Sequence, residues 1–321
     1  MAAPAHKAGH RRFKWQDALR NRPVWADVWY PTADRRDEIL IPYGLGQGRV
    51  IPDAAPAPGE SFPLVVLSPG ASGSATNYSW LAEYLARHGL IVLGVSHYGE
   101  SFVYGVETID PAAVLRLWIR PVDCTFALTQ FLAVDAFGGI VDRARISALG
   151  HSSGGATAMA LGGATLDLDA LAAYCRSDSA RSDLGCHYAR ALGRLPPPPP
   201  EAAMRYRDAR VGAIVALDPA AGPAHDAASL ADVRVRVLVV GSKDNDFLPF
   251  EHHAGRYARF LPNATLIGLD DGEGHFVYLN SCTSDLAANG VPLCVDRLGV
   301  DREKVHAKVA PKILAFVTGA S

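Results

Sequence analysis

The chain has 321 residues, of which 49% are hydrophobic and 20% charged, and its formal net charge is −2. This composition provides enough apolar material for one large core, and the near-neutral charge gives no reason to expect nucleic acid or a membrane surface as a partner. No apolar run approaches the roughly 20 residues that span a bilayer. No hydrophobic stretch follows Met1 to His6, so we expect a signal peptide to be absent or already removed.

The N-terminal part predicts a solvated extension followed by the first strands of a single domain. Residues 1–23 are basic and polar, and we expect them to precede the domain, residues 24–321. A strand is predicted at Val24–Tyr30 and a buried central strand at Phe62–Leu67. Between them, residues 34–60 are rich in Gly, Pro and charge, which predicts a surface segment with one short edge strand.

Apolar strands then alternate with helical segments. Tyr78–Arg87 has helical spacing, Leu90–Val95 predicts a buried strand, and 97–110 predicts a loop. Pro111–Ala136 predicts a long helical stretch, and a break at Pro121 stays open as an alternative. This alternation predicts an α/β fold with a mostly parallel central sheet and helices on both faces.

The most informative stretch is Arg145–Met159, which contains Gly150-His151-Ser152-Ser153-Gly154. An apolar run before this G-x-S-x-G pentapeptide predicts a strand, and small apolar residues after it predict a helix. A serine in such a sharp strand-to-helix turn presents its hydroxyl as a nucleophile. The stretch therefore predicts the nucleophile elbow of an α/β-hydrolase, with Ser152 as the nucleophile.

Residues 163–210 interrupt the alternation and predict an insertion. The segment carries charge, two cysteines and the five consecutive prolines Pro196–Pro200, which predict a stiff polyproline spacer. Two interpretations stay open: a surface connector, or a cap over the active site.

The C-terminal part returns to the alternation. Strands are predicted at Val211–Leu217, Val235–Val240 and Ala264–Leu269, and helices at Phe250–Phe260 and Arg302–Val317.

A serine nucleophile needs a base and a carboxylate that orients the base. In this fold the chain order is serine, acid, histidine. His275 follows the last predicted strand on a Gly-flanked loop and is the expected base. Asp244 is the first choice for the acid, and Asp218 and Asp246 are the alternatives, because all three follow the ends of predicted strands.

The oxyanion of an acyl-transfer intermediate needs two backbone N–H donors. We expect them from Ser153, directly after the nucleophile, and from Ala71, in the loop after the Phe62–Leu67 strand. The sequence has no phosphate-binding glycine motif and no zinc-ligand spacing, so we expect neither an organic cofactor nor a metal.

Five cysteines are present. We predict two local disulfides, Cys175–Cys186 and Cys282–Cys294, and a buried free thiol at Cys124, which would indicate a periplasmic or secreted protein. The alternative is five reduced cysteines in a cytoplasmic enzyme.

Three stretches resemble the platelet-activating-factor acetylhydrolase and dienelactone-hydrolase-like branch of the α/β-hydrolases: LVVLSPGASGSATNYSWLAEYLARHGLIVLGVSH, RISALGHSSGGATAM and GEGHFVYL. The resemblance runs from about Val24 to the C-terminus. It implies Ser152 and His275 as nucleophile and base, and Ala71 and Ser153 as oxyanion donors. For the acid, many members use the position that matches Asp244, and the acetylhydrolases use the one that matches Asp218.

Two departures from the family concern the substrate. Ser68-Pro69-Gly70 replaces the His-Gly of many relatives and resembles polyester-degrading cutinases, but the aromatic pair that those enzymes carry after the Asp218-type strand is missing. Dienelactone hydrolases proper have a Cys nucleophile, so Ser152 favours ester over lactone cleavage.

We therefore expect a serine hydrolase that cleaves short-chain or small aromatic carboxylic esters through an acyl-enzyme. The alternatives are an amidase, peptidase or polyester hydrolase with the same triad, and a non-catalytic binding protein on the same fold. The expected partner is a small-molecule ester, and the expected state is a monomer or homodimer.

Overall fold

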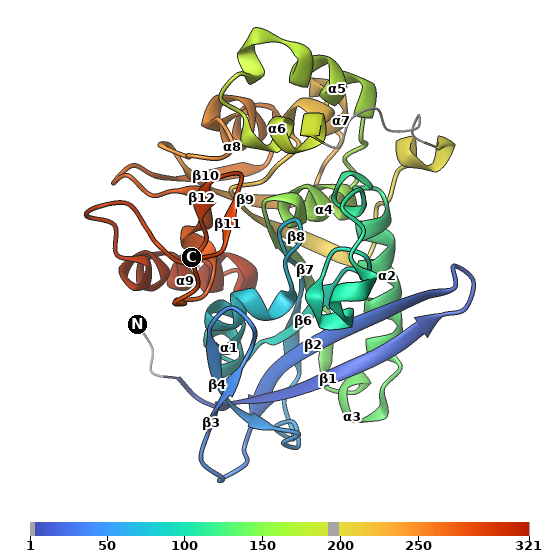
Figure 1. Cartoon of the computed structure of the whole chain (residues 1–321). Helices are drawn as coiled ribbons and strands as arrows, with labels where there is room; N and C mark the ends of the chain where they lie inside the picture. The colour runs from blue at the N-terminus through green and yellow to red at the C-terminus, as the bar shows by residue number, and fades with distance from the viewer. Residues whose placement is uncertain (1–3, 192–198, 321) are drawn as a thin grey trace.

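The computed structural model describes residues 4–191 and 199–320. Within these ranges, ten strands form one sheet in the spatial order β10-β9-β8-β7-β5-β6-β2-β1-β4-β3 (Figure 1). The strands are β1 (Lys7–Asp17), β2 (Arg22–Thr32), β3 (Ile39–Pro42), β4 (Gln47–Pro52), β5 (Phe62–Ser68), β6 (Ile91–Ser96), β7 (Val141–His151), β8 (Val211–Leu217), β9 (Arg236–Ser242) and β10 (Ala264–Leu269). Strands β5 to β10 are parallel, and β2 joins them antiparallel to β6. The mostly parallel sheet is as expected.

Helices cover both faces of this sheet (Figure 1). They are α1 (Ser79–Arg87), α2 (Ile119–Leu132), α3 (Asp135–Gly138), α4 (Ser153–Gly162), α5 (Leu168–Arg176), α6 (Leu184–Ala191), α7 (Ala227–Ala231), α8 (Ala254–Phe260) and α9 (Arg302–Thr318). A short hairpin, β11 (Ala287–Ala288) and β12 (Val291–Pro292), lies between β10 and α9 in the chain.

The core consists of two apolar layers, one on each face of the sheet. Strand β5 shows how the sequence divides between them, because successive side chains of a strand point to opposite faces. Leu64 and Val66 pack with helices α2, α4 and α8, whereas Val65 and Leu67 pack with α1 and α9. All four residues are buried, so the carboxyl end of β5 is held from both sides.

Residues Lys7–Asp17 are part of the sheet, so the expectation of a solvated extension was wrong for them. Strand β1 pairs antiparallel with β2 along its whole length, from Lys7 opposite Thr32 to Asp17 opposite Arg22. Phe13 and Trp15 pack against the core, and the basic residues beside them face outward. Side chains in this segment alternate between the core and the solvent, as in a strand. Its basic composition led us to expect an exposed extension instead.

Two other elements differ from the expectation. Residues 34–60 contain two short strands, β3 and β4, rather than one. The helix expected over Pro111–Ala136 begins only at Ile119, and Pro121 lies in the first turn of α2. A proline is tolerated in a first turn because its missing N–H would have no partner inside the helix, so the helix starts near Pro121 rather than breaking there.

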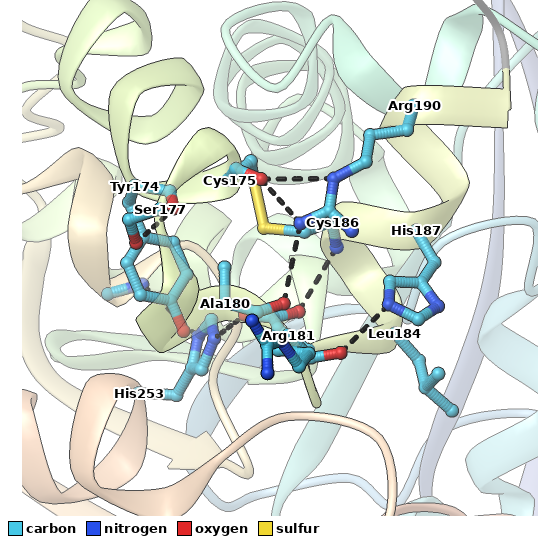
Figure 2. The surroundings of a disulfide bond; sticks show 12 residues. Tyr174, Cys175, Ser177, Ala180, Arg181, Leu184, Cys186, His187, Arg190 and His253 are labelled. Atoms are coloured by element: carbon cyan, nitrogen blue, oxygen red, sulfur yellow. Dashed lines mark hydrogen bonds and ion pairs between the residues drawn. A yellow bond between two sulfur atoms is a disulfide. The ribbon is translucent and has the colours of Figure 1, made fainter.

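The segment between α4 and β8 forms helices α5 and α6 near α7 and α8, at the top of Figure 1. A disulfide joins Cys175 of α5 to Cys186 of α6, and the Arg190 side chain donates to the Cys175 carbonyl (Figure 2). The second expected disulfide, Cys282–Cys294, is also present, and Cys124 is a buried free thiol. Part of the proline run, residues 196–198, lies outside the described residues.

No helix in the described part of the chain is both long and apolar enough to cross a membrane.

Candidate active site

Ser152 lies in a strained turn between β7 and α4. Its backbone angles are φ 55° and ψ −121°, a conformation that a residue with a Cβ rarely adopts. Its N–H donates to the Leu217 carbonyl on β8 at 3.0 Å, and its carbonyl accepts from the Ala220 N–H at 2.9 Å. The turn is thus held by the neighbouring strand, as the pentapeptide predicted.

Two glycines make this turn possible. A Cβ on Gly150 would lie 2.0 Å from the Gly154 carbonyl oxygen, and a Cβ on Gly154 would lie 1.9 Å from the Ser68 carbonyl oxygen. Neither position can accept a larger residue without moving backbone. The absence of side chains therefore lets the end of β5 approach the first turn of α4, beside Ser152.

His275 follows β10 and is fully buried. Asp246 accepts a hydrogen bond from the His275 backbone N–H at 2.8 Å, and His151 Nε2 donates to the His275 carbonyl at 2.9 Å. The Phe247 ring stacks on the imidazole, with 5.2 Å between ring centroids. In the described part of the chain, His275 Nε2 has no hydrogen-bond partner, so this nitrogen is free to act on a substrate or on a nucleophile.

The three candidate acids occupy different positions. Asp218 Oδ2 lies 3.7 Å from His275 Nδ1, and Asp218 Oδ1 accepts from the Ser242 N–H at 2.7 Å. Asp246 holds the backbone of His275 rather than its ring. Asp244, the first choice from the sequence, has an exposed side chain. The geometry therefore favours Asp218, the second choice.

Burial opposes charge on both members of this pair. It raises the pKa of Asp218 to about 8 and lowers the pKa of His275 to about 3. Asn245 also faces the ring, with Nδ2 at 3.3 Å from His275 Nδ1. The side-chain Oδ1 of Asn245 accepts from two backbone N–H groups, which places Nδ2 toward the ring. Burial thus favours the neutral imidazole, the form that a general base requires. For Nε2 to accept a proton, the ring hydrogen must be on Nδ1, where the Asp218 carboxyl group can accept it.

The expected oxyanion loop, residues 69–73, lies over the nucleophile. A Cβ on Gly70 would be 3.5 Å from Ser152 Cβ. The Gly70 N–H donates to Tyr78 Oη at 3.0 Å, and Tyr78 Oη lies 2.8 Å from His151 Nδ1. Since His151 Nε2 donates to the His275 carbonyl, Nδ1 accepts from Tyr78. One chain of hydrogen bonds thus connects the oxyanion loop, the elbow and the histidine loop.

Of the two expected oxyanion donors, Ala71 is exposed in this loop and Ser153 begins helix α4. The two residues belong to the two segments that meet at Gly154, so the structure brings their backbones to the same edge of the sheet.

Sequence reasoning missed the partners of the histidine loop, Asn245 and Phe247. Both lie on the loop after β9, next to the carboxylates that were considered as acids. The only signal was the polar run Ser242 to Asp246, which marked the loop but not which of its side chains face the ring.

Among residues 4–191 and 199–320, no group of three or more His, Cys, Asp or Glu side chains is placed to hold a metal ion.

The sequence is similar to a family of acetylhydrolases and to cutinases. Residues 37–117 match the sequence profile of the family described as platelet-activating factor acetylhydrolase, isoform II. The platelet-activating factor acetylhydrolase of Cavia porcellus is 30% identical over 31% of this chain and 31% of its own length. Cutinase cut1 of Thermobifida fusca is 26% identical over 53% of this chain and 49% of its own length.

A ferulic acid esterase from Streptomyces cinnamoneus has a similar structure, with a TM-score of 0.59 and 21% identity over 98% of this chain and 91% of that chain. This likeness shows the fold, an α/β-hydrolase. The chain spans between about a third and a half of the length of the curated relatives that it matches.

Proposed function

We propose that this chain, an α/β-hydrolase of the platelet-activating factor acetylhydrolase-like family, is a serine hydrolase that cleaves carboxylic esters. One observation carries the proposal. Ser152 sits in a strained strand-to-helix turn, and its neighbour His151 contacts the buried His275, whose Nε2 has no partner and whose Nδ1 faces the buried Asp218. The printed names of the relatives, an acetylhydrolase, cutinases and an esterase, support the same reaction class.

In the proposed reaction, His275 Nε2 takes the proton of Ser152 Oγ while Oγ attacks the ester carbonyl carbon. The carbonyl oxygen becomes an oxyanion, which accepts hydrogen bonds from the Ala71 and Ser153 backbone N–H groups. His275 then gives its proton to the departing alcohol, and the acyl group stays on Ser152. Water activated by His275 releases the acid and restores the serine.

For the acid we propose Asp218 instead of Asp244. An imidazolium forms at His275 during both half-reactions, and the Asp218 carboxyl group beside Nδ1 stabilises that charge in its ionised form. Asp218 Oδ2 needs to move by less than 1 Å from its 3.7 Å separation to reach about 2.9 Å, a hydrogen-bond distance. In apo enzymes such catalytic hydrogen bonds are commonly long.

The substrates that we propose are esters with short-chain or small aromatic acyl groups. Ser152 is only 8% exposed and Phe247 lies against His275, so there is little open surface around the reacting groups. A polyester is the second candidate, and the similarity to cutinases favours it. We further propose that the described part of this insertion, which includes helices α5 and α6, forms a cap, because Leu184 donates its N–H to the Phe247 carbonyl.

The test is hydrolysis of p-nitrophenyl esters from acetyl to dodecanoyl, with methyl ferulate and a polyester film as further substrates. We expect turnover that falls with acyl length and is lost in Ser152→Ala. A fluorophosphonate probe should label the wild type at Ser152 and leave the variant unlabelled. Absence of both turnover and labelling would refute the proposal.

We also propose an oxidising compartment, the periplasm or the exterior of the cell. Both disulfides close short local loops, and disulfides persist outside the reducing cytosol. Thiol titration of the unfolded protein isolated from its native source should count one free thiol, Cys124. A count of five would indicate a cytoplasmic enzyme.

A further inference from the structure

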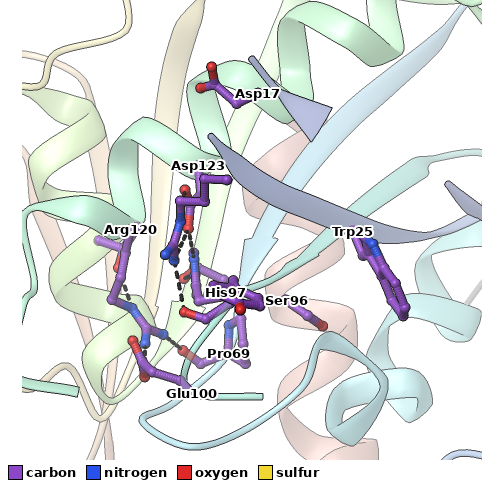
Figure 3. A network of polar contacts seen from close by, with 12 residues as sticks. Asp17, Trp25, Pro69, Ser96, His97, Glu100, Arg120 and Asp123 are labelled. Atoms are coloured by element: carbon purple, nitrogen blue, oxygen red, sulfur yellow. Dashed lines mark hydrogen bonds and ion pairs between the residues drawn. The ribbon is translucent and has the colours of Figure 1, made fainter. Parts of the chain in front are cut away.

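A buried arginine lies behind the oxyanion loop. The Arg120 side chain, on the first turn of α2, is 1% exposed. It forms an ion pair with Glu100, with 2.5 Å between Nη1 and Oε2, and its Nη2 donates to the Pro69 carbonyl (Figure 3). Its Nε donates to Thr157 Oγ1 at 3.2 Å. Each of the three nitrogen atoms of the guanidinium group therefore donates to a different residue.

These contacts reach both segments that supply the proposed oxyanion donors. On one side, Pro69 lies two residues before Ala71, and Glu100 Oε2 accepts from the Ser72 N–H at 3.3 Å. On the other side, Thr157 Oγ1 donates to the Ser153 carbonyl at 2.9 Å. Arg120 is thus connected on either side of Ala71 and to Ser153 itself.

A second buried group holds the start of the same loop. Ser68 Oγ lies 2.9 Å from His97 Nε2, and His97 Nδ1 lies 3.0 Å from Asp123 Oδ2. Asp123 also accepts from Arg20 and Arg22. Because Ser68 directly precedes Pro69, this group limits the movement of the loop at one end. Arg120 is the group that connects the rest of the loop to α4.

We infer that Arg120 is a positioning residue that sets the spacing between the Ala71 and Ser153 N–H groups. The inference rests on the proposed function. An oxyanion hole acts only when both donors point at the place where charge develops. The two donors belong to segments 82 positions apart in the chain, so a connection between them has to come from the tertiary structure. Arginine suits this role because its rigid fork donates several hydrogen bonds at fixed angles.

The test compares esters with thionoesters of the same acyl group. Sulfur accepts hydrogen bonds poorly, so the ratio of the two rates measures the contribution of the oxyanion donors. In Arg120→Met we expect kcat on the ester to fall about 10- to 100-fold, as an Ångström-scale misplacement does, with KM nearly unchanged. The ester-to-thionoester ratio should fall by about tenfold, because the lost interaction forms in the transition state.

Arg120→Lys distinguishes geometry from charge. Lysine keeps the positive charge beside Glu100 but has no planar fork. We therefore expect it to restore stability and to leave the ester-to-thionoester ratio low.

Arg87→Met is the matched control. Arg87 forms a comparable set of contacts, with Glu38, Glu83 and the Arg49 carbonyl, on helix α1. This variant should lower the melting temperature without changing kcat or the rate ratio.

Two further variants keep the test decisive if Arg120→Met folds poorly. The double variant Glu100→Gln, Arg120→Met removes the carboxylate that the single change would leave buried without its partner. Thr157→Val keeps the ion pair and removes only the connection to Ser153.

We expect both variants to lower the ester-to-thionoester ratio. A ratio equal to that of the wild type in these folded variants would overturn the inference. Lack of any ester turnover by the wild type would instead refute the proposed function.

Discussion

The ionised form of Asp218 is the one that the proposed reaction needs, but it is also the form that burial destabilises. Asp218 is fully buried, and its Oδ2 has no hydrogen-bond partner in the described structure. The folded-state pKa of about 8 lies above the ordinary value of 3.8, so the folded protein binds the proton more tightly than the unfolded chain does. Protonation of Asp218 therefore stabilises the folded state in full below about pH 4. This stabilisation is lost as the pH rises through 8.

Asp218→Asn should therefore be more stable than the wild type at pH 8. We expect a gain of at least about 1 kcal/mol in the free energy of unfolding, which shrinks toward pH 4. Esterase activity should fall by roughly 10³- to 10⁴-fold, as expected when an amide replaces a triad carboxylate. Urea unfolding at several pH values and p-nitrophenyl butyrate assays measure the two effects.

Asp244→Asn is the control for this prediction, because the Asp244 side chain is exposed. It should leave stability within about 0.5 kcal/mol of the wild type and leave activity unchanged. The opposite result, with activity lost in Asp244→Asn and kept in Asp218→Asn, would reverse the assignment of the acid.

The same residues show how far the site could be predicted. Ser152 and His275 stand out locally, through the glycine spacing and through a Gly-flanked loop after a strand. The acid does not, because Asp218, Asp244 and Asp246 all follow strand ends. Which of them faces the ring depends on how the loops after β8 and β9 fold over each other, and no local pattern records that. The hydrogen bonds of Arg120 were invisible for the same reason, since they join segments far apart in the chain.

At the scale of elements, segments with a clean apolar period were predicted well. The bounds predicted for Val211–Leu217 and Ala264–Leu269 agree with strands β8 and β10. Strand β1 was missed because only one of its faces is apolar and the other carries Arg and Lys. A buried parallel strand is apolar on both faces, whereas a half-exposed antiparallel strand is apolar on one. Composition alone therefore detects the buried strand more easily.

The segment with α5 and α6 is another element whose role depends on a contact rather than on its sequence. The Leu184 N–H donates to the Phe247 carbonyl, Asn289 Nδ2 donates to the Leu184 carbonyl, and Phe247 stacks on His275. The Asp183 side chain accepts from His253 Nε2 at 2.8 Å, and both residues are buried. The disulfide Cys175–Cys186 therefore joins two helices of a segment that contacts Phe247, the residue stacked on the proposed base His275.

Replacing both Cys175 and Cys186 by Ser should lower the free energy of unfolding by up to about 3 kcal/mol, from the freed loop entropy of the unfolded chain. Hydrogen exchange at the Leu184 amide should become faster, because its contact with Phe247 weakens. Replacing Cys282 and Cys294 by Ser is the matched control, since that pair closes a loop of similar length. It should cost similar stability and leave the Leu184 N–H protected, because Asn289 of that loop contacts the Leu184 carbonyl and not its N–H. Equal exchange at Leu184 in both variants would contradict a specific role for the first bridge.

At the scale of the whole molecule, the fold followed from alternation and the site followed from the sheet. Parallel strands place their carboxyl ends along one edge, so Ser152 after β7, Asp218 after β8 and His275 after β10 come together once the strand order is known. The alternation of apolar strands with helices predicts a parallel sheet covered on both faces, whereas the order of its strands comes from the structure. What the alternation could not supply was the fine spacing at that edge, which depends on buried polar groups and on two glycines.

The buried group Ser68, His97 and Asp123 has a consequence for the recognition of catalytic sites by shape. It satisfies a serine–histidine–aspartate template with shorter separations, 2.9 and 3.0 Å, than the pair His275 and Asp218 at 3.7 Å. A search that ranks such groups by distance alone would choose Ser68 over Ser152, the proposed nucleophile. Ser68 is 2% exposed, and its hydroxyl is hydrogen-bonded to the buried His97. Such a buried group is excluded as a catalytic site when no substrate can reach the serine hydroxyl.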